Sequence, residues 1–330
     1  NMEKINVEFC SPNPTGPLHL AHYRGTIIGE ILSNFLKFIG YDVTKEMYIN
    51  NIGTQVNKFI NTIKYHLGDT NYTPEYHGEY IMDIVKLVQN KHITIDNILN
   101  YNIEHIQQTL EKIGIKHDII TYESDISAST PQVMEYLQSI NLAEYQNNQL
   151  ILKSTEIGDD KDRVLMRSDG TFTYIANDIA YHLNKKRRGF AKQINVLGMD
   201  HIGYFKRLQA GLSKADINLN IISFNVVKLI KDDQLIKMSK RAGTLLAIDE
   251  LIKDIDPDIL KVEMLSKSYM HELNISIQNL VSNKDLVFYI KYTHIRIQSF
   301  YNKLATYPEY DLELLNTEYD EILFQNIIQW

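Results

Sequence analysis

The chain opens with apolar and polar segments in the order strand, loop, helix, strand. Ile5–Cys10 is a short apolar run typical of a buried strand, and the loop Ser11–Pro17, rich in proline and glycine, follows it. Apolar positions then recur at helical spacing over His19–Ile39, and Gly40 provides an end for that helix. Asp42–Tyr48 predicts the next strand. This order indicates the first half of a doubly wound, Rossmann-like α/β sheet, which binds its ligand at the carboxyl ends of parallel strands.

Helical spacing then dominates up to residue 152. Apolar residues recur every three or four positions over 98–113, and a further helix is predicted over 129–140, with Pro131 in its first turn. We therefore expect residues 1–60 to form the first half of the sheet domain. Residues 61–152 are expected to form a helical connective insertion between its two halves.

Strands and helices alternate again after the insertion, which predicts the second half of the sheet domain over residues 153–225. A basic loop and a stem-contact region are predicted over residues 226–275. Residues 276–330 are expected to begin an all-α domain, with an apolar helical stretch over 286–300. The strands predicted in the second half are Val164–Arg167, Ile194–Leu197 and Ile222–Ile230, and the helices are Tyr174–Arg188 and Tyr204–Ala215.

The composition is that of a folded protein with more than one core. The chain has 330 residues, of which 44% are hydrophobic, and single cores stop growing at about 250–300 residues. No apolar run approaches the roughly 20 residues that cross a bilayer, and Glu3, Lys4 and Glu8 interrupt the place of a secretory signal. Because Cys10 is the single cysteine, no internal disulfide forms, and we expect a cytoplasmic protein with no membrane contact.

The net charge of -7 argues against a protein that coats nucleic acid through its overall field. A local basic face remains open, because Lys185, Lys186, Arg187 and Arg188 form the densest cationic run, directly before Gly189, where a helix is expected to end. Cations at that position complement the helix dipole, and they are also suited to contact nucleic-acid phosphates. Both interpretations stay open on the sequence alone.

Two histidines stand at the start of the first predicted helix. His19 and His22 are three residues apart, so both rings lie on one face, next to a loop in which Pro14 and Gly16 let the backbone approach a phosphate. Imidazoles there can stabilise charge on a reacting phosphorus, and each is worth about 3 kcal/mol by comparison with an oxyanion donor. A zinc pair is the alternative, but no third ligand follows at metalloprotease spacing, and we predict no metal site.

A polar segment in the second half of the chain gathers cations. Lys237, Lys240 and Arg241 lie within five residues, around Met238 and Ser239, and a glycine follows. A loop of this kind can close over a triphosphate and neutralise the charge of a departing pyrophosphate. The alternative is a solvated basic turn.

The two segments together resemble a known family. HLAH at 19–22 resembles the HIGH motif, and KMSK at 237–240 is similar to the signature loop, of class I aminoacyl-tRNA synthetases, in the same order along the chain. Longer strings are similar to those of one group within this class, the arginyl-tRNA synthetases. This resemblance extends over about residues 5–300. These strings are VEFCSPNPTGPLHLAHYRG from Val7, YHGEY from Tyr76, GDDKDRVLMRSDGTFTYIANDIAYH from Gly158 and VLGMDH from Val196.

The resemblance implies a sheet of the HUP type and a ligase that works in two steps. ATP would activate L-arginine to arginyl-adenylate, and the arginyl group would pass to the 3′-terminal adenosine of tRNA(Arg). The catalytic groups that the resemblance implies are His19, His22, Lys237 and Lys240. Mg²⁺ would arrive with ATP, no tightly bound cofactor is expected, and the implied partners of a monomeric protein are tRNA(Arg), arginine and ATP.

The residues themselves also indicate a cationic substrate. Tyr174 and Asp178 are four residues apart on one predicted helix, and Glu8 ends the first strand, so carboxylates can converge on a cation. A guanidinium takes a planar, bidentate carboxylate partner, which a lysine side chain would not fully use. The resemblance places Asn13 and His19 near the amino acid, and Tyr174, Asp178 and Glu8 around its guanidinium.

The adenosine end of the nucleotide site is predicted after the strand near residue 194. Gly198 would allow close approach of the base, Asp200 can accept a ribose hydroxyl, and His201 can contact ATP or the amino acid. The alternative is an ordinary strand-to-helix turn. The complete set of predicted ATP-binding residues is Pro14, Gly16, His19, His22, Gly198, Asp200, His201, Lys237, Met238, Ser239 and Lys240.

The chain departs from the family pattern within a motif and at both ends. Ala21 stands where the signature has glycine, and an N-terminal tRNA-elbow domain and most of a helical anticodon domain are expected to be missing. We interpret the chain as a trimmed fragment with reduced tRNA binding, in which Asn1 is a tag remnant. Two alternatives remain: another HIGH-type nucleotidyl transferase or synthetase, which would not use Asp178 to select a guanidinium, and a noncatalytic tRNA-binding relative.

Overall fold

A computed structural model describes residues 3–157, 159–199, 203–204, 208–209, 212, 214–231, 234–236, 246–276, 280 and 284–303. The chain divides into two units, Asn1–Asn283 and Lys284–Trp330. The second unit contains α11 (Lys284–Tyr301), which confirms the helix predicted over 286–300. Six predicted site residues lie outside the described residues: Asp200, His201, Lys237, Met238, Ser239 and Lys240.

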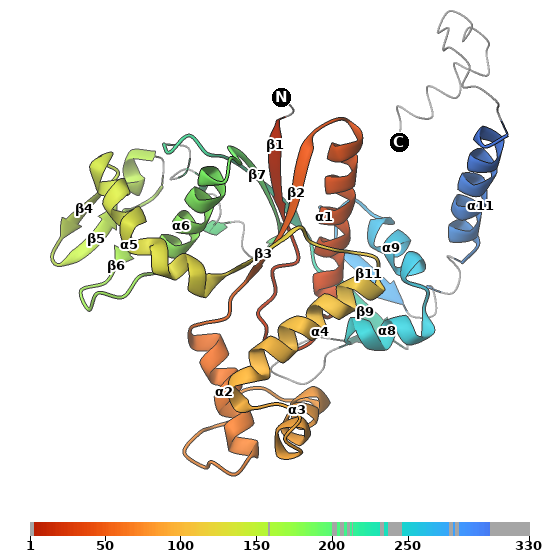
Figure 1. Cartoon of the computed structure of the whole chain (residues 1–330), viewed down its shortest axis with the longest axis horizontal. Helices are drawn as coiled ribbons and strands as arrows, with labels where there is room; N and C mark the ends of the chain where they lie inside the picture. The colour runs from red at the N-terminus through yellow and green to blue at the C-terminus, as the bar shows by residue number, and fades with distance from the viewer. Residues whose placement is uncertain are drawn as a thin grey trace, which may run out of the picture. The chain divides into compact units, whose positions relative to one another are not determined.

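The central sheet of the first unit consists of five parallel strands: β1 (Lys4–Glu8), β2 (Asp42–Ile49), β3 (Ile119–Tyr122), β7 (Lys192–Gly198) and β8 (Asn218–Phe224). Their order across the sheet is β3-β2-β1-β7-β8 (Figure 1). The first strand in the chain, β1, is the central one. β2 and β3 follow on one side of it, and β7 and β8 on the other. This is the order of a doubly wound sheet, so the predicted fold class is confirmed.

α1 (Leu20–Phe38) follows β1 and lies on one side of this sheet, whereas α6 (Tyr174–Arg187) lies on the other (Figure 1). The helix begins with His19 as its N-cap. Its fit depends on a position without a side chain, because a Cβ at Gly29 would lie 2.2 Å from the ring of Phe9. The sequence therefore allows α1 to pack directly on the chain that leaves β1.

The insertion predicted between the sheet halves is helical in its first part. α2 (Thr54–His66), α3 (Glu79–Gln89), the short η1 (Ile95–Asn97) and α4 (Ile98–Lys112) are its helices. The helical spacing over 98–113 therefore predicts α4 correctly. The apolar core of this part consists of Phe59, Ile63, Tyr76, Ile81, Ile84, Val85 and Ile98.

The chain returns to the central sheet at β3, inside the region predicted to be helical. Its residues, Ile119–Tyr122, favour strands, and Thr121 donates a hydrogen bond of 2.6 Å to Oε1 of Glu46 on β2. Four residues are too short a run to show alternation, so the neighbouring helical patterns hide the strand. The expectation of a purely helical insertion is therefore wrong at this point.

A separate antiparallel sheet forms between β3 and α6. It consists of β4 (Ala143–Gln146), β5 (Gln149–Leu152) and β6 (Arg163–Met166). Asn147 and Asn148 connect the first two strands with φ of 49° and 61°, a two-residue turn that asparagine tolerates. The strand predicted near residue 164 exists as β6, but the expectation that it resumes the central sheet is wrong, because it pairs with this hairpin.

The helix before this sheet starts earlier than predicted. α5 (Glu123–Ser139) begins well before Pro131, which lies inside it. Proline removes one backbone hydrogen bond, but the apolar face of α5 is buried against α6, and packing of that kind supplies most of the stability of a helix. The proline is thus not the start signal that the pattern indicates.

The strand predicted over 222–230 is two strands in different sheets. β8 ends at Phe224, and β9 (Val227–Lys231) pairs elsewhere. Asn225 interrupts the run, since its backbone N–H donates to the carbonyl of Tyr269 at 2.8 Å and not to a strand neighbour. Most of the helix predicted over 204–215 lies outside the described residues.

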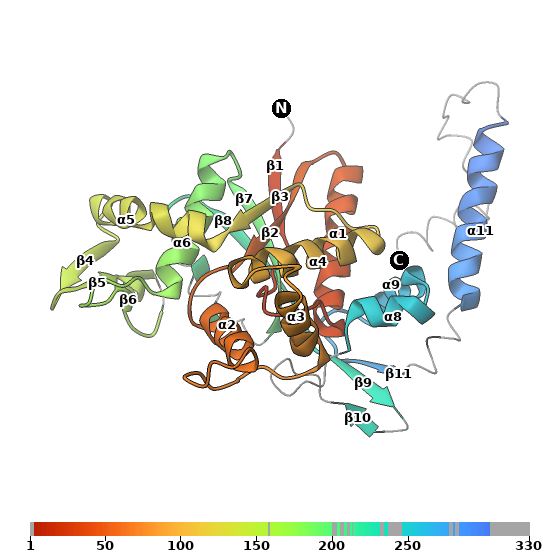
Figure 2. The same ribbon diagram turned by 60° about the horizontal axis from the view of Figure 1, so that its bottom comes forward.

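β9 is the middle strand of a third sheet. Its neighbours are β10 (Gln234–Ile236) and β11 (Leu273–Ser276), and α8 (Ile248–Asp254) and α9 (Pro257–Leu265) precede β11 in the chain. Figure 2 shows these strands and helices together at one side of the first unit.

Arg24 joins α1 to this part of the chain inside the protein. Its side chain has no exposed surface, and Nη1 donates to the carbonyls of Asn225 and His271 at 3.0 and 2.7 Å. Nη2 donates to the carbonyls of Ser268 and Lys267 at 2.9 and 3.3 Å. One of these carbonyls precedes β9 and the other three precede β11, so Arg24 fixes the third sheet against α1.

Replacing Arg24 with methionine should lower the free energy of unfolding by about 2 kcal/mol, because four backbone carbonyls lose their donor. Urea titration followed by circular dichroism measures this change. Lys37→Met is the matched control: Lys37 lies on the same helix with 43% of its side chain exposed, and its loss should change stability by less than about 0.5 kcal/mol. An unchanged unfolding midpoint in the Arg24 variant would contradict this role.

Candidate active site

The two predicted histidines meet at the start of α1. His19 caps the helix, and its backbone N–H donates to Nδ1 of His22 at 3.3 Å. The two rings stack, with centroids 3.7 Å apart and planes 28° apart. Because Nδ1 of His22 accepts a hydrogen bond, the neutral ring carries its proton on Nε2 and can donate from that atom. The pair forms one donor surface beside a helix N-terminus, where the dipole favours an anion.

The loop before α1 is held in place by the helical insertion. Asn102 of α4 donates from Nδ2 to the carbonyl of Pro14 at 2.9 Å, and this hydrogen bond is buried. Tyr80 of α3 packs on Gly16, where an added Cβ would lie 2.8 Å from the tyrosine ring. Gly16 also has a φ of 149°, so both its conformation and its contact favour glycine. The YHGEY string at 76–80 therefore shapes this loop.

The chain returns to His19 shortly after the predicted basic loop. His19 forms an isolated antiparallel bridge with Ala247, and the backbone N–H of Ile248 donates to the carbonyl of Leu18 at 2.9 Å. Residues 237–240 lie outside the described residues, but only a few positions separate them from this bridge. The fold thus joins the HLAH turn to the segment that follows the KMSK string.

Three carboxylates gather at the carboxyl ends of the central strands. Glu8 ends β1, Glu123 directly follows β3, and Asp178 approaches them from α6. Glu8 and Glu123 are 6% and 5% exposed. Burial, together with the charges of the two glutamates, raises the pKa of Asp178 to about 7. A cluster of this kind is unfavourable by itself and is suited to receive a cation.

Tyrosine hydroxyls surround the cluster. Tyr204 donates a hydrogen bond to Oδ2 of Asp178, which favours the ionised form and partly offsets the effect of burial on the pKa. Tyr48, near the end of β2, has a buried hydroxyl with no hydrogen-bond partner among the described residues. Burial raises the pKa of Tyr48, as do the nearby Glu123, Asp178 and Glu8. Its neutral hydroxyl is available to a bound molecule.

Glu123 is a site residue that sequence reasoning misses, since the strand before it is not recognisable. Asn177 donates from Nδ2 to Oε1 of Glu123 at 3.3 Å, and burial raises the pKa of this carboxyl group. A carboxylate directly after a parallel strand is the signal that identifies Glu8, and it would identify Glu123 as well once β3 is known.

Two predicted substrate contacts, Tyr174 and Asn13, lie at the surface. Tyr174 is the first residue of α6 and is 60% exposed, and it is Tyr204 that donates to Asp178. Asn13 is exposed on the loop before α1. Gly198 ends β7 and is half-buried. The structure therefore brings Glu8 and Asp178 together and leaves the other two side chains exposed.

The basic run at the end of α6 is largely engaged inside the protein. Lys185 has no exposed surface, and its Nζ lies 2.7 Å from Oε2 of Glu8. Arg188 donates from Nη2 to both oxygens of Glu46, at 2.8 and 2.9 Å. Arg187 is exposed. These contacts favour a structural role for Lys185 and Arg188 over contact with nucleic-acid phosphates.

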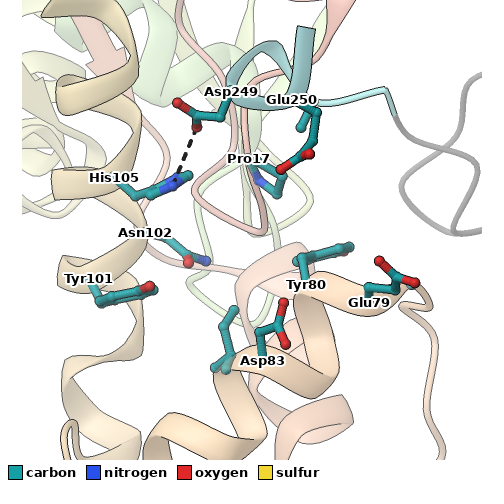
Figure 3. A pocket seen from close by; sticks show the side chains of 12 residues that line it. Pro17, Glu79, Tyr80, Asp83, Tyr101, Asn102, His105, Asp249 and Glu250 are labelled. Carbon is teal, nitrogen blue, oxygen red and sulfur yellow. Dashed lines mark ion pairs between the residues drawn. The ribbon is translucent and has the colours of Figure 1, made fainter. Parts of the chain in front are cut away.

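A cavity of about 470 Å³ borders the loop before α1, between the insertion and the start of α8 (Figure 3). His105 and Asp249 form the ion pair drawn there, with Nε2 and Oδ2 3.3 Å apart. The lining includes four carboxylates, Glu79, Asp83, Asp249 and Glu250. A triphosphate would be repelled by this lining, so the cavity is not where ATP is placed.

Neither a metal centre nor a membrane span occurs in the described part of the chain. No three histidine, cysteine, aspartate or glutamate side chains are arranged there to hold a metal ion, so the histidine pair has no third ligand among these residues. None of the described helices has the length and apolar character that a membrane span requires.

Comparison with known proteins leads to one family. A family model described as tRNA synthetases class I (R), catalytic domain, matches residues 1–76 and 72–274. The arginine–tRNA ligase of Ehrlichia ruminantium (strain Gardel) is 34% identical over the whole of this chain. The chain covers 65% of that relative, so it spans a little under two thirds of its length.

Solved structures agree with this result. A Campylobacter jejuni protein assigned as an arginyl-tRNA synthetase has a TM-score of 0.79 and 32% sequence identity, covering 92% of this chain and 72% of that one. The arginyl-tRNA synthetase of Thermus thermophilus has a TM-score of 0.72 at 18% identity, covering 98% of this chain and 68% of the other. The second likeness supports the fold alone.

Proposed function

The chain belongs to the class I arginyl-tRNA synthetase family, and from this premise we propose that it joins L-arginine to tRNA(Arg) using ATP. Arginine and ATP form arginyl-adenylate and pyrophosphate, and the arginyl group then moves to the 3′-terminal adenosine of the tRNA with release of AMP. The observation that carries the proposal is the carboxylate cluster at the carboxyl ends of the strands, formed by the buried Glu8 and Glu123 and the half-buried Asp178.

The carboxylate cluster is suited to a guanidinium. A carboxylate such as Asp178 accepts two parallel N–H bonds from one planar guanidinium, and Glu123 can accept from its remaining donors. The ammonium of lysine is a point charge with three donors and cannot fill such a planar arrangement. The neutral hydroxyl of Tyr48 offers one further polar contact. Arginine is therefore preferred over lysine, which disfavours a synthetase for another amino acid.

The triphosphate of ATP lies, in this proposal, over the start of α1. The helix N-terminus and the histidine pair provide donors, and the loop with Pro14 and Gly16 lets the backbone approach the phosphates. Gly198, at the end of β7, and Asp200 and His201 after it are proposed for adenosine, on the strand-end rule for doubly wound sheets.

Activation is an in-line displacement at the α-phosphorus. One carboxylate oxygen of arginine forms the new bond, and the bond to the bridging oxygen of pyrophosphate breaks. His19 and His22 donate to the phosphoryl oxygens as negative charge accumulates. Lys237 and Lys240, with the Mg²⁺ that ATP carries, neutralise the departing pyrophosphate. The bridge between His19 and Ala247 supports this placement of the lysines.

Transfer follows at the carbonyl carbon of the adenylate. The 2′ hydroxyl of the terminal ribose attacks, as in enzymes of this class, and AMP leaves. The proposal assigns no side chain as general base, so positioning and electrostatics carry the rate. Asn13 and Tyr174, whose side chains are exposed, are proposed as contacts of the amino acid. A noncatalytic relative would bind tRNA but form no adenylate.

Calorimetric titration of this chain with L-arginine tests the pocket, with L-lysine and L-glutamate as controls. Arginine alone should bind, and its affinity should rise by about tenfold between pH 6 and pH 8, with release of a proton. The sign follows from Asp178: its pKa of about 7 in the free protein means that burial keeps it largely protonated at pH 6, whereas a bound guanidinium requires it ionised.

Two results would count against the pocket. One is lysine binding as tightly as arginine, which would remove the case for a guanidinium. The other is an arginine affinity that is flat or falls between pH 6 and pH 8, which would mean that Asp178 does not meet the ligand.

A further inference from the structure

Lys185 is a buried lysine to which the proposed reaction gives no role. Its side chain has no exposed surface, so its charge must be compensated inside the protein. Nζ donates to Oε2 of Glu8 at 2.7 Å and lies 4.2 Å from the ring centroid of Tyr181. Ser11 donates to the other oxygen of Glu8 at 3.2 Å. Both oxygens of this carboxylate are therefore held by the protein.

The charge of Lys185 also acts on the neighbouring carboxylates. It lowers the pKa of Asp178, against the effect of burial, and it lowers the pKa of Glu46. Glu46 is also bound through both oxygens by Arg188, so two cations compensate its charge. Among the described residues, the other carboxylates near the pocket are Glu8, Glu123 and Asp178.

Few other charges face Asp178 among the residues that the structure describes. Burial lowers the pKa of His182 to about 3, so this ring is neutral. The three tyrosines Tyr48, Tyr181 and Tyr204 have pKa values raised by burial and are neutral as well. Among the described residues, the charges that act on Asp178 are those of Glu8 on β1, Glu123 on α5 and Lys185 on α6. Glu46 on β2 and Arg188 after α6 act on Tyr181.

We propose that Lys185 is a positioning residue of the guanidinium pocket: it fixes the carboxylate of Glu8 and offsets its charge, which leaves Asp178 and Glu123 as the acceptors for arginine. The inference rests on the proposed function, because it assumes that arginine binds at this cluster. Its physical basis is the ion pair itself, since a buried cation beside three carboxylates sets the charge that a ligand meets.

The test is arginine affinity as a function of pH in Lys185→Met, measured by calorimetry on the full chain. Loss of the cation should raise the pKa of Asp178, so arginine should bind about fivefold more weakly at pH 7 and less than about twofold more weakly at pH 8.5. Arg187→Met is the matched control, because it removes a cation from the same helix end at the surface, and it should leave both affinities unchanged.

Two further variants separate charge from structure. Lys185→Arg keeps the charge and should bind arginine within about twofold of the original chain at both pH values. The double variant Glu8→Gln/Lys185→Met removes both charges of the ion pair, so the net charge near Asp178 is unchanged. It should retain the original pH dependence even if the single methionine variant fails to fold.

Distinct outcomes overturn the inference. An unchanged affinity in Lys185→Met, or the same loss at pH 7 and pH 8.5, would reduce Lys185 to a packing residue, and so would a displaced pH dependence in the double variant. If the original chain binds no arginine, the proposed function fails first. If it binds arginine selectively and Lys185→Met behaves identically, the inference about Lys185 alone fails.

Discussion

Asp178→Asn should weaken arginine binding by about a hundredfold, near 3 kcal/mol, because the proposed bidentate charge partner of the guanidinium is lost. Asparagine has nearly the same shape but cannot accept two N–H bonds as an anion. The loss should come with a flatter pH dependence between pH 6 and pH 8, since the group that titrates near neutrality is gone. Calorimetry with L-arginine measures both effects.

ATP binding distinguishes this change from general damage to the fold. Titration with ATP should give the same affinity in Asp178→Asn as in the original chain, since the triphosphate is placed at α1 and not at α6. Asp216→Asn is the matched control, because the Asp216 side chain is 95% exposed. This variant should change neither the affinity for arginine nor the affinity for ATP. Unchanged arginine affinity in Asp178→Asn would refute the assigned pocket.

His22→Ala should slow arginine-dependent pyrophosphate exchange by about a hundredfold, near 3 kcal/mol in the activation free energy, and His19→Ala should have a similar effect. In the proposed mechanism each imidazole donates to charge that develops in the transition state, so the maximal exchange rate should fall more than the affinity for ATP. The two effects should add incompletely, because the rings stack 3.7 Å apart and position one another.

The control for the histidines is His92→Ala, since His92 is exposed after α3 and should leave exchange unchanged. A change of less than about threefold in His22→Ala would mean that the pair only caps α1 and that another group stabilises the phosphorus. A large rise in the ATP concentration needed for half-maximal rate, with an unchanged maximal rate, would place the histidines in ground-state binding.

The elements that the sequence predicts well are the long ones. The strand, loop and helix at the start appear as β1 and α1, because a helix of this length repeats its apolar spacing many times. The carboxylates at the end of β1 and on α6, Glu8 and Asp178, were predicted from position on these elements, and the fold brings them together. Their role in arginine binding stays a prediction.

The short strands are the elements that the sequence hides. Ile119–Tyr122 lies between two helical patterns, and only its pairing with β2 makes it a strand of the central sheet. Glu123 is missed for the same reason, because its meaning depends on the strand that precedes it. The Asn147–Asn148 turn offers a local signal for the β4–β5 hairpin, since two residues with positive φ favour asparagine.

The direction of a charged side chain is also hard to predict from sequence. Lys185 and Arg187 belong to the same basic run, yet the first is fully buried and the second is exposed. Asp178, Tyr181 and Lys185 are spaced three and four residues apart, so they lie on one face of the helix. The fold turns this face towards Glu8. In a run of consecutive charged residues, the sequence does not show which residue lies on the buried face of the helix.

Arginine-dependent exchange of labelled pyrophosphate into ATP, with and without tRNA(Arg) and with lysine and glutamate as controls, tests the central claim most directly. Exchange is expected with arginine and with neither control, since the proposed pocket favours a guanidinium and the proposed nucleotide site lies at the start of α1. Exchange supported equally by lysine or glutamate, or no exchange with arginine when tRNA(Arg) is present, would contradict it.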